Sequence, residues 1–134
     1  MDLAEFIADV PDFPIEGVLF KDITPLLSEP KAFKEAVDLM AAEFEDKEID
    51  QVVAIESRGF IFGAPIAYQL GCGFVLVRKP EKLPREAVSV EYSLEYGTNT
   101  LEMHADAIQP GQKVLVVDDL LATGGSAKAA IELV

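Results

Sequence analysis

The chain has 134 residues, 50% of them hydrophobic and 26% charged, and its formal net charge is −13. This length predicts one domain with a real hydrophobic core, and so acidic a surface disfavours nucleic-acid backbones and anionic lipids as partners. One cysteine, Cys72, excludes an internal disulfide and a cysteine-rich metal site. No window holds the ~20 unbroken apolar residues of a membrane span. Because the acidic start also lacks the features of a signal peptide, we expect a cytoplasmic protein.

The N-terminal segment, residues 1–28, precedes an expected core of residues 29–134. Residues 2–9 are expected to form a short amphipathic helix that Pro11 ends. Residues 11–28 carry three prolines and one glycine among large apolar residues. This composition indicates an ordered, partly apolar loop.

Helical and strand patterns alternate in the middle of the chain. Apolar residues recur at three- and four-residue spacing over residues 30–46, which predicts an amphipathic helix. Short β-branched runs over 51–55 and 74–78 predict two buried strands. The apolar stretch between them, residues 59–71, predicts a helix that Gly71 can end.

The last part of the chain adds a hairpin, a strand and a helix. Residues 87–105 alternate apolar and polar side chains on both sides of Tyr96-Gly97, which predicts an antiparallel hairpin. A third buried strand is expected over 113–118, and a helix from Gly125 onward. The order strand, helix, strand, hairpin, strand, helix predicts an α/β domain with a parallel core sheet and helices on both faces.

Two adjacent acids, Asp118 and Asp119, end the third predicted strand, and a Thr123-Gly-Gly-Ser126 turn follows. Open α/β sheets bind ligands at the carboxyl ends of their strands. Glycines allow close approach of the backbone, hydroxyls add donors, and a helix N-terminus favours an anion. The pattern predicts a phosphate site beside acids that accept hydrogen bonds from a sugar. The alternative is a plain strand–turn–helix in which one acid is an N-cap. A P-loop is excluded, because no G-x-x-x-x-G-K-[ST] stretch occurs.

Two further segments contain basic residues suited to an anion. Ser57-Arg58-Gly59 follows a predicted strand and opens a helix, so it is a second anion site of the same construction, with a guanidinium that can bind oxygens bidentately. A surface ion pair is the alternative for that arginine. Four of the eleven basic residues lie within eight positions: Arg78, Lys79, Lys82 and Arg85. Such a cluster suits an anionic ligand, and a solvated loop is the alternative.

The run VLVVDDLLATGGS (114–126) resembles the phosphoribosyl pyrophosphate (PRPP) signature of the type I phosphoribosyltransferases. Further blocks resemble, in the same order, the adenine-specific branch of this family: FPIEGVLFKDITPLL (13–27), ESRGFIFGAPIA (56–67), VRKPEKLP (77–84) and YSLEYGTNTLEMH (92–104). The resemblance implies a single type I phosphoribosyltransferase domain over 1–134. Its fold is a central, mainly parallel sheet flanked by helices, with an N-terminal hood (1–28) and an antiparallel hairpin or flexible loop. The core (29–134) is expected to lack the C-terminal strand that the resemblance implies.

The resemblance implies transfer of 5-phosphoribose from PRPP to N9 of adenine, giving AMP and pyrophosphate in purine salvage. It implies Mg²⁺ as the cofactor, bound mainly through substrate oxygens with no metal site on the protein, and a homodimer. Two other readings stay open. One is transfer to hypoxanthine, guanine or xanthine, and the other is a non-catalytic regulator that binds PRPP.

The resemblance also assigns the PRPP contacts. Asp118 and Asp119 would hold the ribose hydroxyls. The 5′-phosphate would be cradled by Ala122, Thr123, Gly124, Gly125 and Ser126. The pyrophosphate would be bound by Ser57, Arg58, Arg78, Lys79 and Lys82. A cis peptide is expected at Glu56–Ser57. Lys82 and Arg85 would lie on a mobile loop that closes over the site, and Arg58, Lys79 and Lys82 would assist catalysis.

Adenine recognition is assigned to the hood. Phe20 would stack on the base, with ordinary core packing as its alternative, and Leu19 and Lys21 would offer main-chain hydrogen bonds. Glu95 matches the acid that acts on adenine N7 as N9 attacks, so partial burial should raise its pKa. An exposed hairpin carboxylate is the alternative for Glu95. His104 is expected to be structural.

Overall fold

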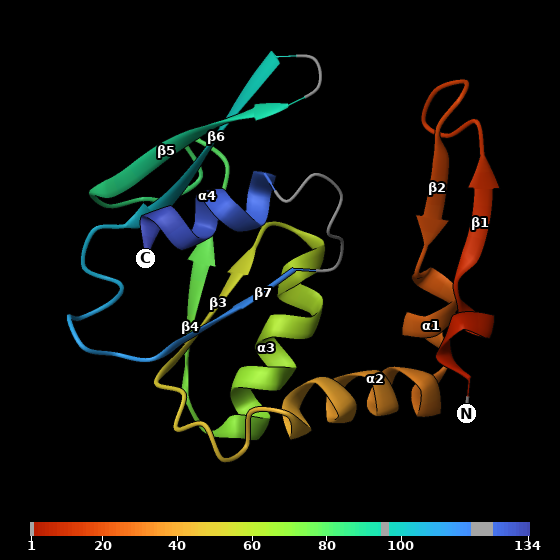
Figure 1. The fold of residues 1–134 in the computed structure, drawn as a ribbon, viewed down its shortest axis with the longest axis horizontal. Coiled ribbons are helices and arrows are strands. Elements are labelled where there is room, and N and C mark those ends of the chain that lie inside the picture. The colour runs from red at the N-terminus through yellow and green to blue at the C-terminus, as the bar shows by residue number, and fades with distance from the viewer. Residues whose placement is uncertain (1, 95–96, 119–124) are drawn as a thin grey trace. The chain divides into compact units, whose positions relative to one another are not determined.

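The computed structural model describes residues 2–94, 97–118 and 125–134 (Figure 1). The chain divides into two compact units, Met1–Ala42 and Glu43–Val134. No helix among the described residues is long and apolar enough to cross a bilayer.

The first unit is a small antiparallel hairpin with helices at both of its chain ends. Its elements are the 3-10 helix η1 (Leu3–Phe6), strands β1 (Ala8–Pro11) and β2 (Leu19–Asp22), and helices α1 (Thr24–Ser28) and α2 (Pro30–Ala42). The two strands pair with Val10 opposite Phe20. Between them the Phe13–Pro14 peptide is cis and Gly17 has a φ of 86°. The turn is closed by a 3.1 Å hydrogen bond from the Phe13 N–H to the Val18 carbonyl.

Two expectations for this unit are wrong. Within residues 2–9 only Leu3–Phe6 is helical, and a strand follows; residues 11–28, expected to be a loop, contain β2 and α1. The prolines stand where regular elements tolerate them, not where elements are broken. Pro11 is the last residue of a strand in a two-stranded pair, and sheets tolerate proline on such edge strands. Pro25 occupies the first turn of α1, where the N–H would have no partner in any case.

Helix α2 ends at Ala42, four residues before the expected end at residue 46. Its buried face consists of Ala32, Ala36, Val37 and Ala41. The residues that follow include three acids, Glu43, Glu45 and Asp46. Negative side chains at a helix C-terminus are unfavourable to the helix dipole, which accounts for the early end.

The second unit is built on a three-stranded parallel sheet. Its strands β3 (Gln51–Ile55), β4 (Gly73–Val77) and β7 (Val114–Val117) are arranged in the order β4-β3-β7, and Figure 1 shows them side by side. In register, Val53 lies opposite both Val75 and Val116. The remaining elements are α3 (Arg58–Leu70), the hairpin strands β5 (Ala87–Leu94) and β6 (Gly97–His104), and α4 (Gly125–Leu133).

The predicted elements of this unit are confirmed. Each expected boundary falls within one residue of the observed one, and Gly71 caps α3 in the left-handed conformation, with a φ of 72°. The hairpin pairs antiparallel as expected, from Ala87 opposite His104 to Leu94 opposite Gly97. The turn residues 95–96 lie outside the described part of the chain.

The two faces of the sheet are covered by different elements. One core cluster joins the sheet to β6 and α4, and contains Val53, Ile55, Val75, Val77, Leu101, Met103 and Ala130. Alternate residues of β3 and β4 point to the opposite face, which α3 covers. Gly63 makes this approach possible, because a Cβ there would lie 2.6 Å from the Cβ of Ala54 and 2.8 Å from the Phe74 ring. The expected helices on both faces are therefore present.

Candidate active site

Three parallel strands end at one edge of the sheet. The residue that follows each strand is a predicted site residue or lies next to one in the sequence. Ile55 pairs with Val77, and Ala54 pairs with Val117. The next residues along the chain are therefore neighbours at the carboxyl edge. These are Glu56 after β3, Arg78 after β4 and Asp118 after β7.

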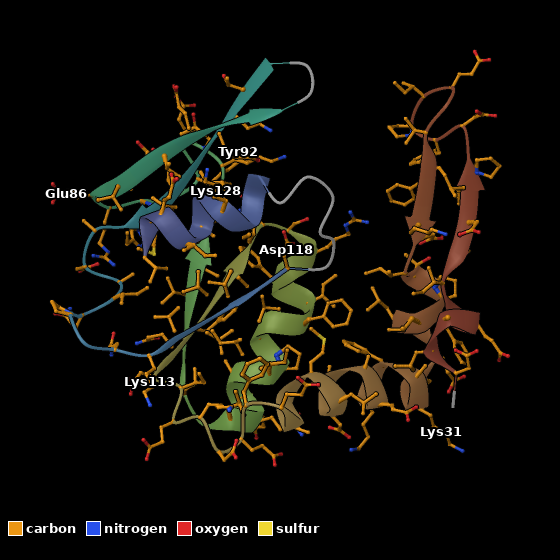
Figure 2. All side chains as sticks on the ribbon, viewed as in Figure 1. Lys31, Glu86, Tyr92, Lys113, Asp118 and Lys128 are labelled. Carbon is orange, nitrogen blue, oxygen red and sulfur yellow. The ribbon has the colours of Figure 1, made fainter. Side chains whose placement is uncertain are left out.

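Gly59, in the first turn of α3, packs against the end of β7. A Cβ at this position would lie 3.1 Å from the Val117 carbonyl oxygen and 3.3 Å from Oδ1 of Asp118. Figure 2 shows Asp118 at the end of β7, and its side chain is half-buried. The Ser57–Gly59 segment and Asp118, nearly sixty residues apart in sequence, are thus brought together.

The Ser57 turn has the geometry expected of an anion site. The Glu56–Ser57 peptide is cis, as predicted. Ser57 is the exposed N-cap residue of α3, and Arg58 is the half-buried first residue of the helix. The first N–H groups of a helix lack intrahelical acceptors, so those at the start of α3 can bind an anion.

Glu56 and Arg78 form an ion pair between the ends of β3 and β4. Nε of Arg78 donates to Oε1 of Glu56 and Nη2 donates to Oε2, both at 3.2 Å. The backbone N–H of Lys79 also donates to Oε1, at 3.0 Å. The Arg78 hydrogen bonds hold the pKa of Glu56 below its ordinary value. Sequence reasoning missed Glu56. An acid and a base that each directly follow a buried strand were the available signal, but using it requires knowing that the two strands are neighbours.

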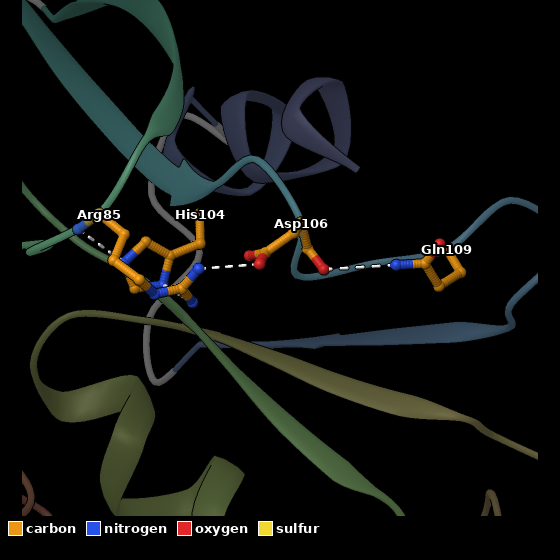
Figure 3. Close-up of polar contacts among 4 residues, drawn as sticks. All are labelled: Arg85, His104, Asp106 and Gln109. Carbon is orange, nitrogen blue, oxygen red and sulfur yellow. Dashed lines mark hydrogen bonds and ion pairs between the residues drawn. The ribbon is translucent and has the colours of Figure 1, made fainter.

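The basic segment, residues 78–86, is tied to the end of β6. Backbone hydrogen bonds join Arg78 and Glu102 in both directions, at 2.8 and 2.9 Å, and the Glu81 N–H donates to Oε1 of Glu102 at 3.2 Å. Further along, Nη1 of Arg85 lies 2.8 Å from Oδ2 of Asp106, and its guanidinium and backbone N–H each approach the His104 ring at 3.4 Å (Figure 3). The Arg85 hydrogen bond lowers the pKa of Asp106.

The four basic side chains of the cluster therefore differ in what they contact. The guanidinium of Arg78 is engaged by Glu56 and that of Arg85 by Asp106. Lys79 and Lys82 are exposed, and within the described ranges their ammonium groups make no hydrogen bond or ion pair. The charge of Lys82 is close enough to help lower the pKa of Glu56. The two lysines are the cations of this segment that can meet an anionic ligand directly.

Several predicted site residues lie outside the described part of the chain: Glu95, Asp119, Ala122, Thr123 and Gly124. Gly125 and Ser126 are the first two residues of α4. The expected phosphate cradle thus leads into a helix N-terminus, as the sequence pattern requires.

The hood residues lie on β2. Leu19 is exposed, and the half-buried Phe20 makes an edge-to-face contact with Phe13, with ring centroids 5.1 Å apart. The Lys21 ammonium forms an ion pair with Asp9 at 2.5 Å. The side chain of Lys21 is therefore engaged, and its backbone is part of β2. Leu19 lies opposite Pro11. Because proline has no N–H, the Leu19 carbonyl receives no ladder hydrogen bond from that residue.

The described residues contain no group of three or more His, Cys, Asp or Glu that could hold a metal ion. Mg²⁺ commonly binds through one or two carboxylates, substrate phosphates and water. The single described carboxylate at the end of β7, Asp118, fits this mode.

The chain is similar to proteins of known family. A family model described as the phosphoribosyl transferase domain matches residues 22–134. Over 133 residues the chain is 60% identical to the adenine phosphoribosyltransferase of Carboxydothermus hydrogenoformans, spanning 99% of this chain and 78% of that protein. The crystal structure of the enzyme from Thermoanaerobacter pseudethanolicus matches with a TM-score of 0.95 and 53% identity, over 98% of this chain and 77% of that one. The enzyme from Saccharomyces cerevisiae, complexed with an imino-altritol bisphosphate and adenine, matches with a TM-score of 0.94 and 43% identity, again over 98% and 77%.

Proposed function

The chain belongs to the adenine phosphoribosyltransferases, enzymes of purine salvage, and on this premise we propose how its residues transfer 5-phosphoribose from PRPP to N9 of adenine. The observation that carries the proposal is the packing of Gly59 against Asp118, which places the start of α3 beside the end of β7 at one sheet edge. In the reaction the bond from C1′ to pyrophosphate breaks, the bond from C1′ to N9 forms, and the proton that adenine gives up passes to the solvent.

Asp118 and Asp119 accept hydrogen bonds from the 2′- and 3′-hydroxyls of the ribose. Carboxylates suit vicinal hydroxyls because they accept hydrogen bonds only and have several acceptor positions. The 5′-phosphate lies in the turn from Ala122 to Ser126. The support for this role is the start of α4 at Gly125, where backbone N–H groups and the helix dipole favour a dianion.

The pyrophosphate is bound by Ser57 and Arg58 at the start of α3 and by the ammonium groups of Lys79 and Lys82. These charges stabilise the leaving group as negative charge develops on it, which is the largest electrostatic demand of the reaction. Arg78 was also predicted to bind pyrophosphate, but its guanidinium is engaged by Glu56 in this structure. Mg²⁺, when bound to the pyrophosphate and ribose oxygens, adds further charge neutralisation.

Adenine stacks on Phe20 and forms hydrogen bonds with main-chain groups of Leu19 and Lys21. The exposed outer edge of β2 and the lysine side chain already paired with Asp9 support this division between backbone and side chain. Glu95 acts on N7 as N9 attacks C1′. The related yeast enzyme was crystallised with adenine and a bisphosphate, which supports the pairing of these two ligands. A cytoplasmic homodimer completes the proposal.

The test is nucleotide formation by the purified chain with Mg²⁺ and PRPP, supplied with adenine, hypoxanthine, guanine or xanthine in turn. We expect AMP and pyrophosphate in equal amounts with adenine and little nucleotide with the others. Preference for a 6-oxopurine would replace the adenine assignment. PRPP binding without pyrophosphate release under any condition would favour the regulator.

A further inference from the structure

Glu56 is a carboxylate at the centre of the proposed site for which the transfer chemistry has no use. Its side chain is 14% exposed. It accepts three hydrogen bonds, two from the Arg78 guanidinium and one from the Lys79 backbone. Its own N–H donates to the Val77 carbonyl at 2.9 Å, which extends the pairing of β3 with β4. Glu56 therefore links the two strand ends through both its backbone and its side chain.

The negative charge of Glu56 at this place must be neutralised. PRPP and pyrophosphate carry several negative charges, and an unpaired carboxylate nearby would repel them. The Arg78 guanidinium neutralises Glu56, so the pair as a whole neither attracts nor repels the substrate strongly. Lys79 and Lys82, whose exposed ammonium groups make no ion pair among the described residues, are then the cations of the basic segment that attract the substrate.

The position of the pair in the chain matters more than its charge. Glu56 directly precedes the Ser57-Arg58 turn, and Arg78 directly precedes Lys79. A planar guanidinium bound to a carboxylate by two parallel hydrogen bonds fixes both partners in distance and orientation. Arg78 is also fixed on its other side, by the paired backbone hydrogen bonds with Glu102. The ion pair is thus a rigid bridge between the two pyrophosphate-binding segments.

We propose that Glu56 is a positioning residue for phosphoribosyl transfer: its bridge to Arg78 sets the spacing between the Ser57-Arg58 turn and Lys79. The inference rests on the proposed function. It assigns Arg78 a different role from the one its sequence suggests, because Arg78 acts on the substrate through Glu56 and not by contact. A small change in this spacing weakens binding of the pyrophosphate group while binding of adenine is unaffected.

The first variant is Glu56→Gln, which keeps the side-chain size and removes the charge. We expect the KM for PRPP to rise about tenfold, equivalent to about 1.4 kcal/mol, with the KM for adenine unchanged. A residue with a merely structural role would lower the melting temperature and the active fraction without this selective change in KM. The matched control is Glu48→Gln, the same substitution before the other end of β3, where the side chain is 89% exposed. Both KM values should stay unchanged in the control.

The second test separates the two roles of Arg78. In Arg78→Met the Glu56 carboxylate is left without its partner beside the substrate, so the KM for PRPP should rise about thirtyfold or more, as expected for an orphaned charge. Adding Glu56→Gln to this variant removes the repulsion, and the double variant should recover to the level of Glu56→Gln alone. If the two effects simply multiply, Arg78 contacts the substrate directly and the inference is wrong.

Wild type is measured first, so that the two proposals fail separately. Absence of AMP formation by wild type would overturn the proposed function, whereas an active wild type with an unchanged KM for PRPP in Glu56→Gln would overturn only the role of Glu56. Should Glu56→Gln be unfolded at the assay temperature, Arg78→Lys carries the same test. It keeps the charge but loses the bidentate geometry, and the inference requires it to raise the KM for PRPP selectively.

Discussion

Gly59 is the residue at which the start of α3 packs against the end of β7. The atoms that a Cβ would approach are the Val117 carbonyl oxygen, at 3.1 Å, and Oδ1 of Asp118, at 3.3 Å. The carbonyl belongs to a sheet strand and cannot rotate away, so α3 or the end of β7 must shift. We expect Gly59→Ala to lower kcat/KM for PRPP about tenfold, since small displacements of positioning groups have large effects. Steady-state AMP formation measures the change.

The control for this substitution is Gly73→Ala at the amino end of β4. There the nearest atoms to an added Cβ belong to the Gln51 side-chain amide, which can swing aside. Its kcat/KM should remain within about twofold of wild type. Equal losses in both variants would indicate a general loss of fold and would contradict the special role of Gly59.

The Glu56 carboxylate also makes a prediction about pH. Because Arg78 holds its pKa in the folded state below the ordinary value of 4.5, the ionised group stabilises the fold. This stabilisation is complete above the unfolded-state pKa and is lost as the pH falls through the lower folded-state value. The difference in melting temperature between wild type and Glu56→Gln should therefore be largest above pH 4.5 and shrink in more acidic solution. If the difference in melting temperature does not change with pH, the ionised form of Glu56 does not stabilise the fold.

At the scale of the elements, burial decided what could be read from the sequence. Strands β3, β4 and β7 form a parallel sheet covered on both faces, so they appear as short apolar runs with clear ends. Strands β1 and β2 have four residues each and form an isolated pair with little burial, so neither has a hydrophobic signature. Their pairing depends on a turn that contains a cis proline peptide, and local composition does not reveal that partner.

The residues of the candidate site also differ in whether the sequence alone could reveal them. Turns with a strong local pattern, such as Ser57-Arg58-Gly59, could be found from the sequence alone, and so could the cis peptide that a family resemblance implies. The ion pair of Glu56 and Arg78 could not, because it depends on β3 and β4 being neighbours. The same holds for Arg85, whose attachment to Asp106 is a tertiary contact invisible in a basic cluster.

Helix α3 provides a prediction at this scale. Gly63 faces Ala54 and Phe74 at distances of 2.6 and 2.8 Å from an added Cβ. Neither neighbour can yield easily, since one is a strand methyl group and the other a packed ring. Gly63→Ala should lower the free energy of unfolding by about 1–3 kcal/mol, the usual cost of overpacking. Urea unfolding measures it, and Ala64→Ser on the exposed side of the same helix should change it little. A Gly63→Ala chain as stable as wild type would mean that α3 does not pack this closely.

At the scale of the whole molecule, the net negative charge opposes the binding of anionic ligands. The chain carries 24 acidic and 11 basic residues, yet its proposed ligands are anions. Attraction must therefore come from local groups, namely the helix N-termini and the cations of the sheet edge, since the overall field is repulsive. Specific placement of a few cations, and not net charge, then determines affinity for PRPP.

The division into two compact units suggests that the two substrates are bound by separate parts of the chain. The proposed stacking and main-chain contacts to adenine lie in Met1–Ala42, whereas Glu95 and the proposed PRPP contacts lie in Glu43–Val134. We expect Phe20→Leu to raise the KM for adenine about tenfold, because stacking of a base on an aromatic ring contributes about 1–3 kcal/mol. Its KM for PRPP should not change. Asp118→Asn should give the reverse pattern, with a raised KM for PRPP only.

The informative control is Phe13→Leu, which removes the edge-to-face partner of Phe20 but leaves its ring in place. If Phe20 served only to hold the β1–β2 hairpin together, the two substitutions would break the same aromatic pair and have equal effects on the KM for adenine. If Phe20 stacks on the base, Phe13→Leu should lower the melting temperature as much as Phe20→Leu does, yet raise the KM for adenine far less. The ratio of the two KM values therefore separates base recognition from hairpin packing within one pair of rings.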